Sequence, residues 1–562
     1  MEPATIAAQL RELAVYYELD GDKHRSYAYD RAAKSVEAAN GLHRLVEEGR
    51  LEELPGVGAS IARVVAELAR RGTVDVLDRL RAAWPPIVIE LAQLPKVGVP
   101  RARKIFQAFA PADLEAVATA CRAGLISELP GFGKVSEQRI LQSIEERRLK
   151  GAQVLLVDAE GHALSLAAHL RADPAALKVE ICGPVRRYIE VIDHLAYAVA
   201  TLDPAKMIER LASFALVTSI DRQQQATVDA PVVAYLAGGL RAEVYLAAPS
   251  HLGWAQIVAT GSPEHVALLR ARAADRGMSM QILEANDEPH VYRALGLPWI
   301  PPEVRDGTDE VSAAAAGDDF HDLITLDDLT AATHCHTTYS DGKNSVAEMV
   351  RAAAELGFDA ITITDHSAAA SYASGLDLDR LRQQAAEIAA LTDPEARVLR
   401  GTEADILEDG GIDVPPEMIG ELDVIIASVH QRFSLDEDAM TRRVVAAMRQ
   451  PFFKIWGHAL GRLVLRRDPI KLRLDEVLDV AAESQCAIEI NGDPHRLDLD
   501  PVSARKAVVR GIKFVLSSDA HSTRGLGAVR FAVAMARRAR IRKQHVLNAL
   551  PADELAAAIR PR

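Results

Sequence analysis

The sequence has few cysteines and few aromatic residues, and it lacks any long hydrophobic run. Its four cysteines are scattered without a paired spacing: Cys121, Cys182, Cys335 and Cys486. This excludes a disulfide framework and a cysteine-based zinc site as organising features. No stretch of about 18 apolar residues occurs, and the first residues lack the basic and apolar parts of a secretory signal. We therefore expect a soluble cytoplasmic chain with no membrane partner.

Positive charge is also scarce relative to negative charge. The net charge is −14 over 562 residues, which argues against a protein that coats nucleic acid through bulk charge. Any contact with DNA must therefore be local. A chain of this length exceeds the roughly 250 to 300 residues over which a single core usually grows, so we expect several domains.

One short segment, residues 333–342, concentrates possible metal ligands. His334 and His336 are two residues apart, so on an extended strand both imidazoles project from the same face while Cys335 points away. Asp341 follows at a turn. A single His-x-His is a weak signal, because such pairs are often ordinary surface or hydrogen-bonded histidines. The interpretation therefore depends on the rest of the C-terminal half.

The residues after this segment repeat one pattern, in which a short apolar run ends at a histidine or an acidic residue. Runs near residues 360, 397, 423, 454 and 512 lead in this way to His366, Glu403, His430, His458, Asp519 and His521. Helical stretches at 345–356 and 378–391 separate the first runs. Strands that alternate with helices predict a parallel sheet, and parallel barrels place functional groups at the carboxyl ends of their strands. The pattern predicts one metal site at a barrel mouth.

From about Asp328 onward the sequence resembles the PHP (polymerase and histidinol phosphatase) domain, a distorted (β/α)7 barrel with a multinuclear metal centre. The resemblance implies metal ligands at nine positions, all occupied here: His334, His336, Asp341, His366, Glu403, His430, His458, Asp519 and His521. It implies that Glu403 bridges two ions. It also groups the ligands into Asp341, His366 and His521 for one ion, His334, His336, Glu403 and Asp519 for a second, and His430 and His458 with Glu403 for a third.

Imidazole and carboxylate ligands without thiolate suit Mn or Zn, with Fe also possible. Two to three such divalent ions imply hydrolysis of a phosphoester, with Glu403, Asp519 and His521 as the catalytic residues. Four side chains just beyond strand ends offer donors to a phosphate: Lys343, Arg462, Asn491 and Arg496. For each of them an ordinary role at the barrel rim is the alternative.

Three glycine-containing turns, each followed by a helical segment, punctuate the N-terminal region. They contain Gly56 and Gly58, then Gly98 after Pro95 and Lys96, and finally Gly131 and Gly133. Glycine permits a tight turn, and the N–H groups at the following helix start can bind a phosphate. The segments resemble helix-hairpin-helix motifs, which implies sequence-independent DNA binding. Basic and aromatic side chains could line a path for a DNA end: Lys23, Arg25, Tyr27, Tyr29 and Arg31.

Residues 150–320 resemble the palm and thumb of family X DNA polymerases, so that the whole chain resembles the bacterial PolX family. The resemblance implies five domains: a helical domain at 1–80 with one helix-hairpin-helix, a fingers-like helical domain at 81–150 with two more, an α+β palm at 151–245, a thumb-like domain at 246–320, and the PHP domain at 328–562. It also implies a protein that works in the bacterial nucleoid.

The palm departs from the polymerase pattern at its catalytic positions. The family carries an Asp-x-Asp pair after its glycine motif, and the matching residues are His194 and Ala196, or Asp193 and Leu195 if the register slides by one. Neither register supplies a carboxylate pair. Glu243 occupies the third acidic position, and Pro184 replaces a phosphate-binding serine. Ser60 and Val64 occupy the positions of the lysines that act in related lyases.

The sequence therefore favours a DNA-binding, metal-dependent phosphoesterase, most simply a 3′→5′ exonuclease that trims gapped or 3′-ended DNA in repair. Removal of 3′-phosphates and cleavage at abasic sites are possible further activities. Three alternatives remain open: a small-molecule phosphatase of the histidinol-phosphatase type, a non-enzymatic DNA-end scaffold with structural metals, and a gap-filling polymerase that is still active.

Overall fold

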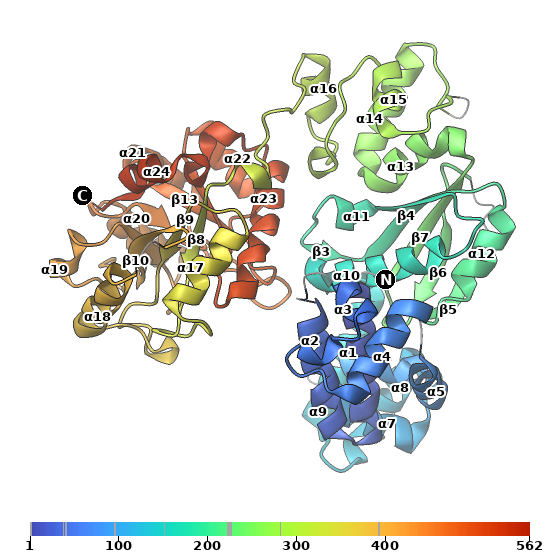
Figure 1. Ribbon diagram of the computed structural model, residues 1–562. Helices are drawn as coiled ribbons and strands as arrows, with labels where there is room; N and C mark the ends of the chain where they lie inside the picture. The colour runs from blue at the N-terminus through green and yellow to red at the C-terminus, as the bar shows by residue number, and fades with distance from the viewer. Residues whose placement is uncertain are drawn as a thin grey trace. The chain divides into compact units, whose positions relative to one another are not determined.

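The computed structural model describes residues 3–37, 39, 42–72, 74–94, 97–150, 152–221, 227–280, 283–391 and 394–561. The chain divides into two compact units, Met1–Asp318 and Asp319–Arg562, drawn in blue to yellow-green and in yellow to red in Figure 1. The finer boundaries expected inside the first unit stay predictions. Within the described ranges, no helix is both long enough and apolar enough to cross a membrane.

The first 150 residues are helical, as expected. The helices are α1 (Pro3–Asp20), α2 (Lys23–Glu37), α3 (Leu42–Glu47), α4 (Ala59–Arg71), α5 (Asp75–Ala83), α6 (Pro86–Gln93), α7 (Gly98–Phe109), α8 (Leu114–Arg122) and α9 (Lys134–Lys150). Helix α4 shows why these segments fold, because Ile61, Val65 and Leu68 recur at helical spacing and are buried. The helix ends where Gly72 adopts a left-handed conformation.

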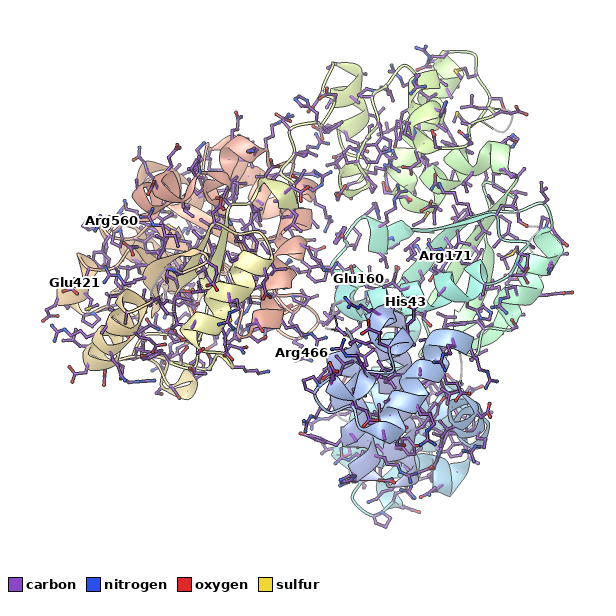
Figure 2. The ribbon with its side chains drawn as sticks, in the orientation of Figure 1. His43, Glu160, Arg171, Glu421, Arg466 and Arg560 are labelled. Atoms are coloured by element: carbon purple, nitrogen blue, oxygen red, sulfur yellow. The ribbon has the colours of Figure 1, made fainter. Side chains whose placement is uncertain are left out.

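A mixed sheet follows, with strand order β2-β4-β7-β6-β5. Its strands are β2 (Lys178–Cys182), β4 (His194–Ala200), β5 (Val217–Asp221), β6 (Val232–Leu236) and β7 (Arg241–Ala247); β1 (Val154–Leu155) pairs separately with β3 (Val191–Ile192). Only the central β4–β7 pair of this sheet is parallel. The accompanying helices are α10 (Leu156–Arg171), α11 (Gly183–Arg186) and α12 (Pro204–Ala212). Arg171, labelled in Figure 2, ties α10 to β2 through Val179 O.

The remainder of the first unit is helical again: α13 (Leu252–Thr260), α14 (Pro263–Asp275), α15 (Glu288–Ala294) and α16 (Glu310–Ala315). Two side chains cap these helices, because Ser262 accepts a hydrogen bond from His265 N and Asp287 accepts one from His290 N. Helix α13 is buried along nearly its whole length, and it packs against β4, β7 and α15.

The second unit is a parallel barrel, as the alternation of strands and helices predicted. Its seven strands follow one another in chain order: β8 (Ala331–Cys335), β9 (Ala360–Ile363), β10 (Arg397–Asp405), β11 (Val424–Ser428), β12 (Ile455–Trp456), β13 (Ala487–Asn491) and β14 (Phe514–Ser517). A bridge between Cys335 and Ala520 nearly closes the ring. Helices surround the strands (Figure 1): α17 (Val346–Glu355), α18 (Leu378–Ala389), α19 (Pro416–Ile419), α20 (Glu437–Met448), α21 (Leu474–Glu483), α22 (Pro501–Val509), α23 (Val529–Arg538) and α24 (Ala552–Ile559).

Helix α24 fills the amino-terminal end of the barrel. Its Leu555 and Ile559 pack into one buried cluster with residues from the strands, among them Ala331, Ala360 and Val424 at the strand starts. This apolar layer excludes water from one end of the barrel. The opposite, carboxyl-terminal end of the strands is where such barrels place their functional groups.

Candidate metal centre

The nine residues expected as metal ligands all lie at the carboxyl ends of barrel strands. His334 belongs to β8 and Glu403 to β10, and the others follow their strands: His336, Asp341, His366, His430, His458, Asp519 and His521. The strand-end placement confirms the expected barrel. It brings together side chains that are up to 187 residues apart in the sequence.

The His334–His336 pair is not on a regular extended segment, which corrects the expectation from its spacing. A register irregularity separates Ala332 from Cys335, and His334 has φ 60°. Asp519 is also left-handed, with φ 50°. Such backbone costs about 1–3 kcal/mol per residue and clusters at functional sites. The bulge re-aims the side chains, so that the ring centroids of His334 and His336 lie 5.2 Å apart.

Glu403 is the centre of the cluster. Its two carboxylate oxygens face different imidazoles: Oε2 lies 3.4 Å from His334, 3.6 Å from His336 and 2.9 Å from His366, whereas Oε1 lies 2.8 Å from His458 and 3.1 Å from His430. A carboxylate with ligand nitrogens on both sides is arranged as a bridging ligand would be.

Three sets of ligand atoms lie within 4.8 Å of one another: His336, Asp341, His366 and His521; His334, His336 and Asp519; and His366, Glu403 and His430. This grouping differs from the expected one because His336 joins the Asp341 set and His366 joins the Glu403 set. The ring of His336 stands between two sets, with Nδ1 3.9 Å from Asp341 and Nε2 3.3 Å from Asp519.

The cluster fits a metal centre by a test that does not depend on any resemblance. His334 Nε2, both ring nitrogens of His336 and His458 Nδ1 are buried without a hydrogen-bond partner. An unsatisfied buried polar group costs about 1–3 kcal/mol, so several in one place require another partner. Imidazole nitrogens beside carboxylates are ligands that divalent transition metals prefer.

The charges inside the cluster also suit metal binding. Burial acts to raise the pKa of Glu403, but His430 and His334 hold that pKa well below its usual value. Burial lowers the pKa of His336 to about 4. Glu403 is therefore ionised and His336 neutral at pH 7, as ligands need. Against the effect of burial, Glu489 raises the pKa of His334 and Glu403 raises that of His430 to about 10, so these two imidazoles release a proton when a metal binds.

Two buried carboxylates that the sequence analysis missed orient the histidines. His430 Nδ1 donates to Asp405 Oδ1 at 2.5 Å, and His334 Nδ1 donates to Glu489 Oε1 at 2.5 Å. Such carboxylates fix the tautomer and the direction of the ring. Asp405 lies two residues after Glu403 on β10, so strand alternation was the signal that could have found it.

Asp365 was also missed, and it shapes the loop that carries Asp341. Its carboxylate accepts hydrogen bonds from Thr337 N at 2.8 Å, Ser340 N at 3.1 Å and Gln384 Nε2 at 2.6 Å. Asp365 is fully buried. These bonds fix the turn and hold Asp341 beside the histidines.

The four expected substrate contacts divide into two pairs. Lys343 is exposed, and Arg496 Nε lies 3.6 Å from Asp519 Oδ2. Asn491 is instead buried, and its amide donates to Asp519 Oδ2 at 3.2 Å. Arg462 donates to the backbone oxygens of Arg496 and Leu497. Asn491 is therefore placed to support Asp519 and Arg462 to support the segment that carries Arg496, and the expected contacts of all four residues with a substrate stay a prediction.

The palm-like sheet places the expected polymerase residues on neighbouring strands. Ala196 on β4 pairs with Glu243 on β7, and His194 Nε2 lies 4.0 Å from Glu243 Oε2. The register with His194 and Ala196 is therefore the one that faces Glu243. Asp193 is exposed and accepts a hydrogen bond from His194 Nδ1 at 2.7 Å. Pro184 is buried in α11.

A buried ion network joins α11 to α15. Glu288 is 3% exposed and accepts paired hydrogen bonds from Arg186 at 2.7 and 2.9 Å and from Arg305 at 2.6 and 2.9 Å. Burial acts to raise the pKa of Glu288, but the two guanidinium groups hold it far below its usual value. The charges of this region are therefore paired with one another.

The glycine turns have the expected geometry where they are described. Gly56, Gly98 and Gly131 have positive φ angles of 81°, 65° and 89°. A Cβ at Gly58 or Gly133 would meet no atom within 4 Å, so both turns are open to a ligand. Pro95 and Lys96 lie outside the described residues.

The prediction that Tyr29 lines a path for a DNA end is wrong, because this side chain is not at the surface. Tyr29 is buried and stacks on Tyr17, with ring centroids 5.2 Å apart. Burial raises its pKa to about 12. Tyr27 on the same helix is 82% exposed, so it remains available for a ligand.

Comparisons with known proteins agree with this division of the chain. Family profiles match a "Helix-hairpin-helix domain" at residues 1–74, a "SAM-like Helix-hairpin-helix tandem" at 88–146, a "DNA polymerase beta thumb" at 255–306 and a "PHP domain" at 332–493. Fold and site thus define a polymerase-type chain fused to a metal-dependent phosphoesterase barrel.

The full-length relatives make the assignment more specific. The chain is 30% identical over 574 residues to "DNA polymerase/3'-5' exonuclease PolX" of Bacillus subtilis, and the alignment covers 100% of both proteins. A "Probable phosphatase" of Caldanaerobacter subterraneus is 28% identical over 237 residues, which cover 39% of this chain and 87% of that protein. The chain belongs to the bacterial PolX family with a C-terminal PHP domain.

Proposed function

We propose that this protein is a DNA-acting, metal-dependent phosphoesterase, specifically a 3′→5′ exonuclease that trims gapped or 3′-ended DNA during repair in the bacterial cytoplasm. Nucleotide addition is lost or residual. The observation that carries the proposal is that Glu403 faces five imidazoles in the barrel, whereas Ala196 stands opposite Glu243 in the palm. Removal of 3′-phosphates and cleavage at abasic sites are further reactions of the same centre.

Divalent ions held by the nine residues, Mn or Zn with Fe also fitting, would polarise the phosphoester and lower the pKa of the attacking water. The chain positions the ligands for this role. Asp405 and Glu489 turn the Nε2 atoms of His430 and His334 toward Glu403. Arg496, beside Asp519, is placed to contact a phosphate oxygen of the substrate.

The helix-hairpin-helix segments support DNA as the substrate. Gly58 and Gly133 directly precede α4 and α9 and leave space at the helix starts. Backbone N–H groups there can contact phosphates without reading sequence. Local contacts of this kind are compatible with a net charge of −14. The name of the Bacillus subtilis relative, which includes a 3′-5′ exonuclease, supports the same reaction.

Two alternatives have specific support. The relatives named as probable phosphatases cover only 39% of this chain, about the length of the barrel, which favours a small-molecule phosphatase. Glu243 and the exposed Asp193 leave two acidic groups near the palm position, which favours a residual polymerase. The first alternative leaves the helix-hairpin-helix segments without a role, and the second lacks a carboxylate at the position of Ala196.

One assay separates these readings. Purified full-length protein is incubated with Mn²⁺ and a labelled gapped duplex, with and without nucleotides, and the primer length is followed. We expect stepwise shortening in both conditions. His334→Ala should abolish shortening, and Glu243→Ala should leave it unchanged.

Primer extension that Glu243→Ala abolishes would overturn the assignment of the palm. Shortening that survives in His334→Ala would place the nuclease outside the barrel. Rapid hydrolysis of small monoesters with no action on DNA would favour the phosphatase.

A further inference from the structure

One aromatic ring is exposed beside the buried metal centre. Tyr372, in the 3₁₀ helix η6 (Ser371–Ala373) after β9, is 66% exposed. Its ring centroid lies 6.2 Å from that of His366 and 6.4 Å from that of His430. The side chains of these two histidines are only 6% and 7% exposed. The ring therefore stands between the buried ligands and solvent.

The loop that carries Tyr372 is held by contacts at both ends. Ala369 N donates to Asp413 Oδ2 at 2.6 Å, and Leu376 N donates to His366 O at 2.7 Å. Arg380 also donates to Ser374 O at 2.5 Å. Ala370 and Ala373 are buried. The exposed position of the ring is therefore fixed by the fold around it.

Two guanidinium groups share this side of the centre. Arg496 lies beside Asp519, and Arg467 lies over the Phe433 ring at 3.8 Å and donates to Gly461 O at 2.8 Å. Burial and then the charge of Arg496 lower the pKa of Arg467. Burial and the carboxylates of the centre raise the pKa of the Tyr372 phenol, and Arg496 acts against them. Among the described residues, Arg467 has no carboxylate within ion-pair distance. Two neighbouring guanidinium groups, of which Arg467 lacks an ion-pair partner among these residues, suit a phosphate.

We propose that Tyr372 and Arg467, with Arg496, form a nucleotide subsite at the metal centre. The Tyr372 ring stacks on the terminal base, and the two arginines bind the adjoining phosphate. This inference rests on the proposed function, and it names the feature that separates a nucleotide end from other phosphate esters. An aromatic ring accepts any base, because every base has a π-face. The subsite is therefore indifferent to sequence, like the helix-hairpin-helix contacts.

The test is a binding measurement that needs no turnover. Calorimetry of the full-length, Mn²⁺-loaded protein compares deoxyadenosine monophosphate with deoxyribose 5-phosphate, which lacks the base. The wild type should bind the nucleotide about tenfold more tightly. Tyr372→Leu should reduce that ratio to about one by weakening the nucleotide alone, and Tyr372→Phe should keep it. Arg467→Gln should weaken both ligands equally.

Tyr235→Leu, which removes a 43% exposed tyrosine of the first unit, is the matched control, and the metal content of each variant is measured. An unchanged ratio in Tyr372→Leu, or an equal loss for both ligands, would overturn the subsite. A protein that does not shorten DNA but loses nucleotide preference in Tyr372→Leu would refute the exonuclease and keep the subsite. DNA shortening by the wild type, together with an unchanged ratio in Tyr372→Leu, would support the exonuclease and refute the subsite.

Discussion

Buried charged groups have different partners in the two units. Those beside the palm-like sheet are paired with one another, whereas those in the barrel are not fully paired. In the first unit, Glu288 is matched by Arg186 and Arg305 through hydrogen bonds of 2.6–2.9 Å. In the barrel, His334 Nε2 and both ring nitrogens of His336 are buried without a hydrogen-bond partner. Charges that satisfy one another stabilise a fold, whereas a buried cluster with unmet partners requires a ligand. The difference supports the barrel as the place of the proposed hydrolysis.

The largest effect should come from the residue at the centre of the barrel cluster. Glu403→Gln keeps the shape but removes the charge between the histidines, so we expect loss of bound metal and a fall in DNA shortening of at least about 10⁴-fold, part of the 10⁶-fold or more that enzymes provide. Metal analysis and a primer assay measure both. Glu421→Gln, an exposed change on the same unit (Figure 2), is the control. Full activity in Glu403→Gln would show that the barrel cluster does not need this charge to bind metal, and the contrast with the paired charges of the first unit would fail.

The next effect concerns stability in the first unit. Glu288→Gln leaves the buried Arg305 and the partly buried Arg186 without a counter-charge, so unfolding should become easier by about 3–5 kcal/mol. Trp299 donates to Glu288 at 3.1 Å, and its fluorescence follows urea unfolding. The pKa of Glu288 is depressed in the folded state, so its contribution is complete above the ordinary value of 4.5 and fades as pH falls below it. A wild-type advantage that grew on acidification would contradict this account.

Much of the barrel site could be predicted because its signals are local. Each strand is a short apolar run, and each ligand follows it within a few residues, as in the run at 360–363 before His366. The parallel arrangement then brings these ends together without further information. The palm register was left open by the sequence and is decided by the structure: Ala196 pairs with Glu243, and a Cβ at Gly183 would lie 2.7 Å from that of Ala196.

The remaining features depend on contacts between distant segments. The Glu288–Arg186 pair spans 102 residues and the Glu489–His334 pair spans 155. No spacing rule predicts them. The left-handed backbone of His334 and Asp519 was missed because neither is a glycine. Strand alternation alone therefore assigned the pair His334–His336 to a regular strand that the fold distorts.

A smaller effect should follow from a carboxylate that orients a ligand. Asp405→Asn replaces the charged acceptor of His430 Nδ1, now 2.5 Å away, with a neutral amide oxygen, so metal affinity should fall about 10- to 100-fold. Competition with a chelator measures the affinity directly. Glu408→Gln, an exposed neighbour on the same loop, should change nothing. Unaltered affinity in Asp405→Asn would mean that the charge of Asp405 does not contribute to metal binding.

The smallest effect tests how far the palm is from catalysis. Ala196→Asp introduces a carboxylate opposite Glu243 at a position that is 1% exposed, so we expect a loss of stability of about 2 kcal/mol. Nucleotide addition should not return, because His194 and Pro184 still occupy the other two positions. Melting temperature and primer extension on a gapped duplex measure these outcomes, with Ala196→Ser as the uncharged control. Primer extension by Ala196→Asp would mean that the missing carboxylate at this position alone prevents nucleotide addition.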